Sequence, residues 1–260
     1  MPLVRVEHLR KEFGAVVAVD GVTLDADGGE VVALVGDNGA GKSTVVNCLA
    51  GVYPPTSGRI LLDGAAVQFP HPLEARRQGI EAVFQDLALA DLQPVYMNMF
   101  LGRELVRGLL RRLDRETMSA ETQRLLDDLD VRIDSPRKTI RDLSGGQRQA
   151  VAITRAVHWA QRLVLMDEPT ASLGVAETQR VEELIRRLRD RGTAILLISH
   201  SLDQVFGLAD RICVLRRGKQ VGIRTAAQTT GEEIVAMITG LAFANRCDSS
   251  RAMNVLESAS

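Results

Sequence analysis

The stretch GDNGAGKST, residues 36–44, constrains the fold of this 260-residue chain more than any other feature. It follows the apolar run VVALV (31–35) and precedes TVVNCLAG (44–51), which is typical of a helix. A glycine-rich turn between a strand and a helix is the P-loop pattern, in which backbone N–H groups and the positive end of the helix bind phosphate. The order strand, loop, helix therefore predicts an α/β core with a phosphate-binding site at its edge.

Each residue type in this loop suits a nucleoside triphosphate. Gly36, Gly39 and Gly41 have no Cβ atoms, so the backbone can wrap closely around a phosphate. We expect Lys42 to reach the β- and γ-phosphates and Ser43 to offer its hydroxyl to Mg²⁺. A glycine-rich turn with a surface lysine is the alternative, but it does not account for the flanking strand and helix. The other expected ATP-binding residues are Asp37, Asn38, Ala40 and Thr44.

Polar side chains follow three other apolar runs. LVLMDE (163–168) ends in Asp167 and Glu168, AILLISH (194–200) ends in His200, and AVFQD (82–86) contains Gln85. Runs this short and this apolar suit parallel strands covered on both faces, and ligands of open α/β sheets bind beyond the carboxyl ends of such strands. The pattern therefore places these side chains at one edge of the sheet, together with the P-loop.

These side chains predict roles in nucleotide hydrolysis. Asp167 would hold Mg²⁺, Glu168 would polarise the attacking water, and His200 would contact the γ-phosphate and steady Glu168. Gln85 would touch Mg²⁺ or water in a closed state, although by itself it is equally consistent with a structural role. A solvated acidic turn is the alternative for the carboxylates, and a structural side chain is the alternative for the histidine.

The rest of the chain divides by pattern. Residues 1–30 alternate apolar and polar positions between glycine turns, and SGRILLDGAAV (57–67) continues this, which predicts an antiparallel sheet against the core. Apolar residues of VAETQRVEELIRRLRDRG (175–192) recur at helical spacing up to Gly192. We expect core segments at 1–85 and 156–240, an inserted helical subdomain at 86–155, and a flexible tail at 241–260.

Composition limits the partners of the chain. The net charge of −1 gives no field that would attract nucleic acid, so none is expected as a partner. The arginines near residues 103–115 are interpreted as a solvated helix face, with a basic patch as the alternative. Three scattered cysteines fit a reducing compartment, and no signal peptide or membrane span is visible. Any role at a membrane must then be exercised from outside the lipid.

A second predicted anion site lies in TIRDLSGGQRQAVAITRA, residues 139–156. Ser144, Gly145, Gly146 and Gln147 form a small turn that opens a helix, and the bare N–H groups of a helix N-terminus bind anions. One chain would thus carry two phosphate-binding helix starts about a hundred residues apart.

With these motifs assembled, residues 3–240 resemble the ATP-binding-cassette (ABC) ATPases, the nucleotide-binding subunits of ABC transporters. GDNGAGKST resembles the Walker A loop, LVLMDE the Walker B strand, Gln85 the Q-loop, His200 the switch histidine and LSGGQ (143–147) the signature sequence. The resemblance implies a P-loop NTPase (RecA-like) fold: a mostly parallel sheet with an N-terminal antiparallel β subdomain and an inserted helical subdomain. It also implies ATP hydrolysis with Mg²⁺, held by Ser43, Asp167 and Gln85.

The resemblance accounts for the second helix start. In this family the signature residues, here 144–147, close over the ATP held by another chain, so two chains complete two sites. A homodimer is expected, with a different cassette chain as the alternative partner. Phe13 resembles the ring that stacks on adenine, with core packing as the alternative. Where the family usually has an Asp after Walker B, this chain has Gly174, which leaves communication through that segment in question.

The resemblance also implies several partners and a cellular localisation. TASLGV (170–175), GIEAVFQDLAL (79–89) and NMFLGRE (98–104) are similar to single-cassette subunits of monosaccharide importers. Membrane permease subunits, docked near residues 86–110, and indirectly a sugar-binding protein would then be partners, at the cytoplasmic face of the inner membrane. An importer for a non-sugar solute and a soluble non-transport ABC ATPase are the alternatives.

Overall fold

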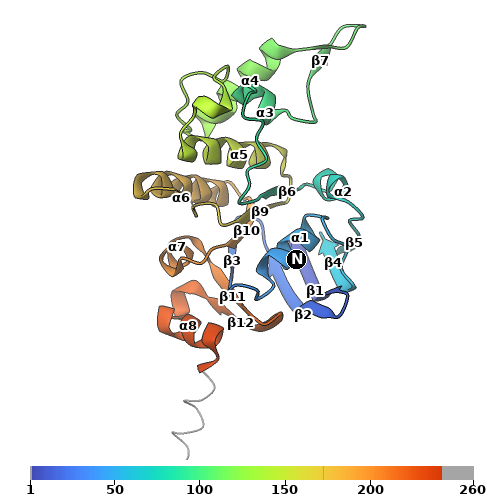
Figure 1. Ribbon diagram of the computed structural model, residues 1–260, viewed down its shortest axis with the longest axis vertical. Coiled ribbons are helices and arrows are strands. Elements are labelled where there is room, and N and C mark those ends of the chain that lie inside the picture. The colour runs from blue at the N-terminus through green and yellow to red at the C-terminus, as the bar shows by residue number, and fades with distance from the viewer. Residues whose placement is uncertain (1, 172, 242–260) are drawn as a thin grey trace, which may run out of the picture.

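The computed structural model describes residues 2–171 and 173–241, and a six-stranded sheet forms its centre (Figure 1). The strand order is β12-β11-β3-β10-β9-β6, in which only β12 is antiparallel to its neighbour. The predicted α/β fold with a mostly parallel sheet is confirmed. The strands are β3 (Val31–Val35), β6 (Ile80–Val83), β9 (Leu163–Asp167), β10 (Ala194–Ile198), β11 (Arg211–Arg216) and β12 (Lys219–Thr225).

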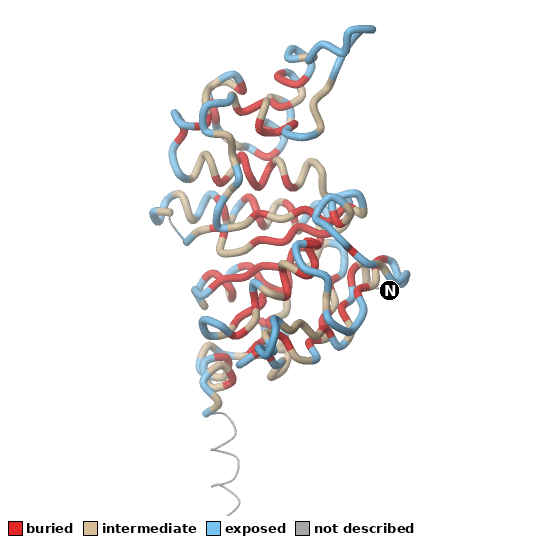
Figure 2. Tube along the Cα trace, turned by 45° about the vertical axis from the view of Figure 1, so that its right-hand side comes forward, coloured by how far each residue is buried: buried red, intermediate tan, exposed pale blue. Residues whose placement is uncertain are grey.

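The two faces of this sheet are buried in two different apolar cores. Side chains of a strand alternate between faces, so Val32 and Leu34 of β3 pack toward α1 and the N-terminal sheet, whereas Val31 and Ala33 pack toward α5 to α8. Figure 2 shows buried chain, in red, through the middle of the molecule, with more exposed chain at its margins. Burial on both faces explains why these strands are continuous apolar runs in the sequence. The covering helices include α1 (Lys42–Leu49), α6 (Val175–Asp190), α7 (Leu202–Leu208) and α8 (Gly231–Thr239).

The N-terminal part of the chain forms the predicted antiparallel sheet, with the strand order β2-β1-β4-β5. Val4 and Val6 of β1 face the core and Arg5 between them faces outward, as the alternation in the sequence indicated. The elements are β1 (Val4–Phe13), β2 (Val16–Ala26), β4 (Ser57–Leu62) and β5 (Ala65–Val67), followed by the short helix α2 (Pro72–Arg77).

The segment between β6 and β9 is mainly helical and has an apolar cluster of its own, at the top of Figure 1. Met99, Phe100, Met118 and Leu126 are among its fully buried side chains. The helices are α3 (Val95–Met99), α4 (Arg115–Asp128), the 3-10 turn η1 (Ile140–Asp142) and α5 (Gly145–Trp159). The predicted division of the chain at residues 85, 155 and 240 stays a prediction. The expected tail lies outside the described residues from position 242 onward.

The interpretation of the arginine-rich segment as a helix face is wrong. Residues 106–113 form a small antiparallel hairpin, β7 (Val106–Arg107) and β8 (Arg112–Leu113), because Gly108 and Arg111 adopt positive φ and turn the chain. Arg103 lies before the hairpin and turns inward, where it donates to Glu81. Within residues 2–171 and 173–241, no helix combines the length and the apolar character needed to cross a bilayer.

Candidate nucleotide-binding and hydrolysis site

The loop between β3 and α1 has a backbone that only glycine can adopt at two positions. Gly36 has φ of 151° and Gly41, which caps α1, has φ of 101°. A Cβ atom on Gly36 would lie 2.2 Å from the Leu215 carbonyl oxygen, and one on Gly41 would lie 2.6 Å from that of Ala18. Close contact with the backbones of β11 and β2 therefore fixes the conformation of the loop, and the loop positions the start of α1.

Lys42 is held inside this loop by neutral partners. Its Nζ donates to the carbonyl oxygens of Gly36, at 2.7 Å, and Asp37, at 3.0 Å, and the residue is only 8% exposed. Burial lowers the pKa of Lys42, while the nearby carboxylates of Glu168, Asp167 and Asp37 oppose this shift. A buried ammonium group at the N-terminus of a helix is an arrangement that binds phosphate. Asp37, Asn38, Gly39 and Ser43 are exposed around it, Thr44 is half-buried and Ala40 is buried.

The order of the strands brings the predicted catalytic side chains together. β10 lies between β3 and β9, with Ile198 opposite both Leu34 and Asp167, and β6 pairs with the far side of β9. The residues that follow these strands therefore leave the sheet at the same edge, next to the P-loop. This is the edge at which the sequence predicted a nucleotide site.

Asp167 and Ser43 fit a magnesium ion. They are hydrogen-bonded to each other across the gap between β9 and α1. Burial raises the pKa of Asp167, and the hydrogen bond from Ser43 opposes this shift. A hydroxyl and a partly buried carboxylate beside a phosphate loop are the oxygen ligands that Mg²⁺ prefers. Gln85, two residues beyond β6, is exposed.

Glu168 and His200 form a pair at the ends of β9 and β10. The Nδ1 atom of His200 lies 3.2 Å from Oε2 of Glu168. Glu168 has a positive φ of 51°, and its N–H donates to the Ile198 carbonyl at 3.0 Å. Non-glycine residues in this backbone region are uncommon and cluster at functional sites. The carboxylate therefore has a fixed turn beneath it and a histidine beside it, as a group that orients water requires.

Phe13 is too exposed to be a core residue, which excludes the alternative of core packing. It is 43% exposed and makes an edge contact with Tyr53, with ring centroids 5.2 Å apart. Lys11 lies over both rings, 5.1 Å from the centroid of Phe13 and 5.7 Å from that of Tyr53. Phe13 also pairs with Val16 where β1 and β2 meet, and residues of β2 a few positions after Val16 lie close to Gly41. Sequence reasoning missed Tyr53, whose only signal was the scarcity of tyrosine.

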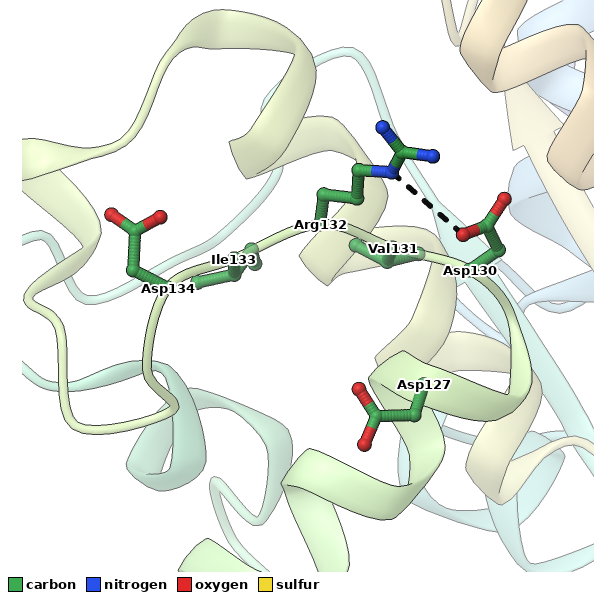
Figure 3. A pocket seen from close by; sticks show the side chains of 6 residues that line it. All are labelled: Asp127, Asp130, Val131, Arg132, Ile133 and Asp134. Atoms are coloured by element: carbon green, nitrogen blue, oxygen red, sulfur yellow. Dashed lines mark ion pairs between the residues drawn. The ribbon is translucent and has the colours of Figure 1, made fainter.

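The signature residues form the helix start that was expected. Ser144 caps α5: its hydroxyl accepts from the Gln147 N–H at 3.2 Å, and the Gln147 side chain accepts from the Ser144 N–H at 3.1 Å. The Gln147 amide also donates to the Arg132 carbonyl at 3.0 Å. Arg132 lies in the loop of residues 130–134, which lines a hollow of about 350 Å³ and in which Arg132 is paired with Asp130 (Figure 3).

The two predicted phosphate-binding helix starts remain apart in one chain. Within the described residues, no hydrogen bond or ion pair joins residues 144–147 to residues 36–44. In the described part of one chain, the two helix starts are thus separate features.

Glu177 is a residue of this region that sequence reasoning missed. One of its carboxylate oxygens accepts from the Gly146 N–H and the other from the Gly174 N–H, each at 3.3 Å. These hydrogen bonds, together with one from the Ser144 hydroxyl, lower the pKa of Glu177. The signal was available, because an acidic residue at the third position of a helix commonly bonds the N–H of the capping residue.

Comparisons with known proteins agree with this geometry. The family described as ABC transporter matches residues 19–171, more than half of the chain. The xylose/arabinose import ATP-binding protein of Sulfolobus acidocaldarius is 44% identical over 93% of this chain and 95% of its own length. The fructose import ATP-binding protein of Rhizobium meliloti is 42% identical over 92% and 94%.

A longer relative and a solved structure extend the comparison. The ribose import ATP-binding protein of Yersinia pestis is 42% identical, and the match spans 92% of this chain but 47% of that protein. A solved nucleotide-free ATP-binding cassette from an ABC transporter has a TM-score of 0.78 and 26% identity, covering 92% of this chain and 96% of that one. The fold, the site and these relatives together show that the chain belongs to the ABC transporter family, as an ATP-binding cassette.

Proposed function

We propose that this chain hydrolyses ATP to power the import of a monosaccharide through separate membrane permease subunits. The observation that carries the proposal is the convergence of Lys42, the Ser43–Asp167 pair and the Glu168–His200 pair at one edge of the sheet. The monosaccharide is inferred from the relatives, which are named for the import of xylose and arabinose, fructose and ribose. This cassette itself would not contact the sugar.

In the proposed reaction, water attacks the γ-phosphorus and the bond to the leaving ADP oxygen breaks. Lys42 binds the β- and γ-phosphates, and Glu168 accepts a hydrogen bond from the water and aligns it. His200 holds Glu168 through the 3.2 Å contact and reaches toward the γ-phosphate. Ser43 and Asp167, joined by Gln85 in a closed state, would hold Mg²⁺, which neutralises phosphate charge when it is bound. Phe13 and Tyr53 offer an exposed ring to the adenine.

The site is completed in trans. The Ser144 hydroxyl, the N–H groups of Gly145 and Gly146, and the α5 N-terminus would meet the γ-phosphate bound by a second copy of this chain. Two such contacts related by a two-fold axis close a homodimer. Hydrolysis then waits for closure, because the signature residues arrive only in the pair.

The partners are permease subunits at the cytoplasmic face of the inner membrane and, indirectly, a sugar-binding protein. We assign permease docking to the surface of residues 86–110, where Leu92 is 74% exposed and Leu101 is 49% exposed. Gln85 immediately precedes this surface and follows β6. A change at the γ-phosphate could therefore reach the permease through one short segment.

The experiment that tests this function is the mass of Glu168→Gln by light scattering, with and without Mg-ATP. The substitution keeps the shape of residue 168 but removes the carboxylate that aligns water, so ATP should bind and remain intact. We expect a change from 28.3 kDa to twice that mass on addition of Mg-ATP. The matched control carries Lys42→Ala as well and should stay monomeric. A Glu168→Gln chain that binds ATP and stays monomeric would contradict self-pairing and the trans role of residues 144–147.

A further inference from the structure

One carboxylate occupies several hydrogen-bond donors of the signature turn. Glu177 accepts from the Gly146 N–H at 3.3 Å and from the hydroxyl of Ser144. It reaches them from α6, 31 residues further along the chain than Gly146. The approach is close, since a Cβ atom on Gly146 would lie 2.9 Å from the Cβ and Cγ atoms of Glu177. The turn is therefore built around a negatively charged group of its own chain.

These donors are the ones that the proposed function assigns to a γ-phosphate. The Gly146 amide has a single hydrogen, so it cannot bond fully to a carboxylate and to a phosphate at the same time. A carboxylate and a phosphate placed on the same donors also repel each other. Either the phosphate is kept away or the carboxylate must leave.

We propose that Glu177 is an internal stand-in for the phosphate, and that closure of the ATP-bound pair transfers the Ser144 hydroxyl and the Gly146 amide from Glu177 to the γ-phosphate on the partner chain. This inference rests on the proposed trans site. Glu177 is a positioning residue in this scheme: it keeps the turn in its anion-binding shape in the single chain and opposes closure until a phosphate replaces it.

The surroundings of Glu177 give the displaced carboxylate a place to go. A cavity of about 440 Å³ adjoins the turn, and Gly146, Gln147, Glu177 and Arg180 are among the residues that line it. Arg180 lies one turn further along α6, is exposed, and already attracts the Glu177 carboxylate. A change of side-chain rotamer could therefore exchange the Gly146 contact for one with Arg180, because residues three apart on a helix are neighbours.

The same carboxylate connects the turn to the segment that follows Walker B. Its other oxygen accepts from the N–H of Gly174, where the resembling family usually has an Asp. Gly174 lies six residues after Glu168 in the chain. Displacement of Glu177 would therefore also change the contact with Gly174, in the segment that leads from Glu168 to α6. This would couple the signature turn to that segment although position 174 carries no aspartate.

The test measures the Mg-ATP concentration that half-dimerises the Glu168→Gln chain. Glu177→Ala and Glu177→Gln are each added to this background, and Glu183→Gln is the matched control, since Glu183 is an exposed acid on the same helix that lines the same cavity. We expect Glu177→Ala to lower the midpoint on the order of tenfold, as for removal of a competing charged hydrogen-bond acceptor. Glu177→Gln should lower it less, and Glu183→Gln should leave it unchanged.

The direction of the change separates this role from a purely structural one. If Glu177 only held the fold of the turn, Glu177→Ala would weaken dimerisation, and that result or an unchanged midpoint would overturn the proposal. The affinity of the single chain for ATP should stay the same in all variants, because the P-loop is elsewhere. Unfolding temperatures of the variants check that each remains folded.

A second measurement does not depend on dimerisation. In the nucleotide-free single chain, the NMR signal of the Gly146 amide should move in Glu177→Gln and stay in place in Glu183→Gln. An unmoved signal would overturn the contact itself. If the signal moves but the Glu168→Gln chain never dimerises in the presence of Mg-ATP, the trans site of the proposed function has failed. The phosphate exchange is then rejected as well, while the Glu177 contact stands.

Discussion

Replacement of Gly36 by alanine tests the idea that neighbouring strands shape the phosphate loop. Gly36 has φ of 151°, a conformation that residues with a side chain rarely adopt. Its added Cβ atom would lie 2.2 Å from the Leu215 carbonyl oxygen and 3.1 Å from the Cβ atom of Ala40. The first of these atoms belongs to the backbone of β11, which pairs with β3, so it cannot move without disturbing the central sheet.

Gly39 in the same loop provides the comparison. It also has a positive φ, of 78°, but nothing lies within 4 Å of its would-be Cβ atom. Gly39→Ala should therefore cost only the backbone strain, about 1–2 kcal/mol. Gly36→Ala should cost about 1–3 kcal/mol of backbone strain and a further 1–3 kcal/mol to separate the overlapping atoms. The difference corresponds to an unfolding temperature lower by roughly 3–10 °C than that of Gly39→Ala.

The assay is thermal unfolding of both variants without nucleotide, combined with equilibrium binding of an ATP analogue. Gly36→Ala should lose stability and nucleotide binding together, because the widened loop no longer holds Lys42 against its carbonyl partners. Equal unfolding temperatures for Gly36→Ala and Gly39→Ala would refute the argument that contact with β11 determines the loop.

Two further predictions concern buried charges and thiols. Arg103 donates to buried Glu81 at 2.8 Å and lies 4.6 Å over the Trp159 ring, so Arg103→Ala should lower the free energy of unfolding by about 2 kcal/mol. Burial already raises the pKa of Glu81, which means that the native chain binds this proton more tightly than the unfolded chain. Above its raised pKa, Glu81 is ionised, and in Arg103→Ala this buried charge has lost its partner. Denaturation curves should therefore show that Arg103→Ala lowers the free energy of unfolding more at pH 8 than at pH 5. An equal loss of free energy at the two pH values would contradict this. Burial also raises the pKa of Cys48 to about 11 and that of Cys213 to about 12, so a thiol reagent at pH 8 should modify neither in the folded chain and both after unfolding, as mass spectrometry of the peptides can establish. Rapid labelling of either thiol in the native chain would count against its burial.

Much of the site followed from local patterns in the sequence. Strands β3, β9 and β10 lie close to the predicted runs, because strands buried on both faces must be apolar throughout. Parallel strands end at a common edge, so the polar residues after each run could be placed near the P-loop without knowledge of the strand order. The start of α5 at Ser144 was predictable for a similar reason, since the cap and its glutamine are three residues apart.

Contacts between distant segments could not be obtained in this way. His200 was expected to steady Glu168, but only the structure places β10 directly beside β9 and brings the two side chains to 3.2 Å. The edge contact of Phe13 with Tyr53, which joins a strand end to the segment after α1, had no counterpart in the sequence analysis. The arginine-rich segment was predicted wrongly for the same reason. Its charges suggested a helix, but the chain turns at Gly108 and Arg111, and Arg103 before the turn is directed inward to Glu81.

The sequence by itself determined the α/β class, the P-loop and the set of polar residues at the strand ends, because these depend on local periodicity and on glycine in a tight loop. The tertiary structure alone decided which strands are neighbours, that Tyr53 lies beside Phe13, and that Glu177 holds the signature turn. The physical reason is that such contacts join segments tens of residues apart, and only the packing of the sheet and its helices brings them within hydrogen-bond distance.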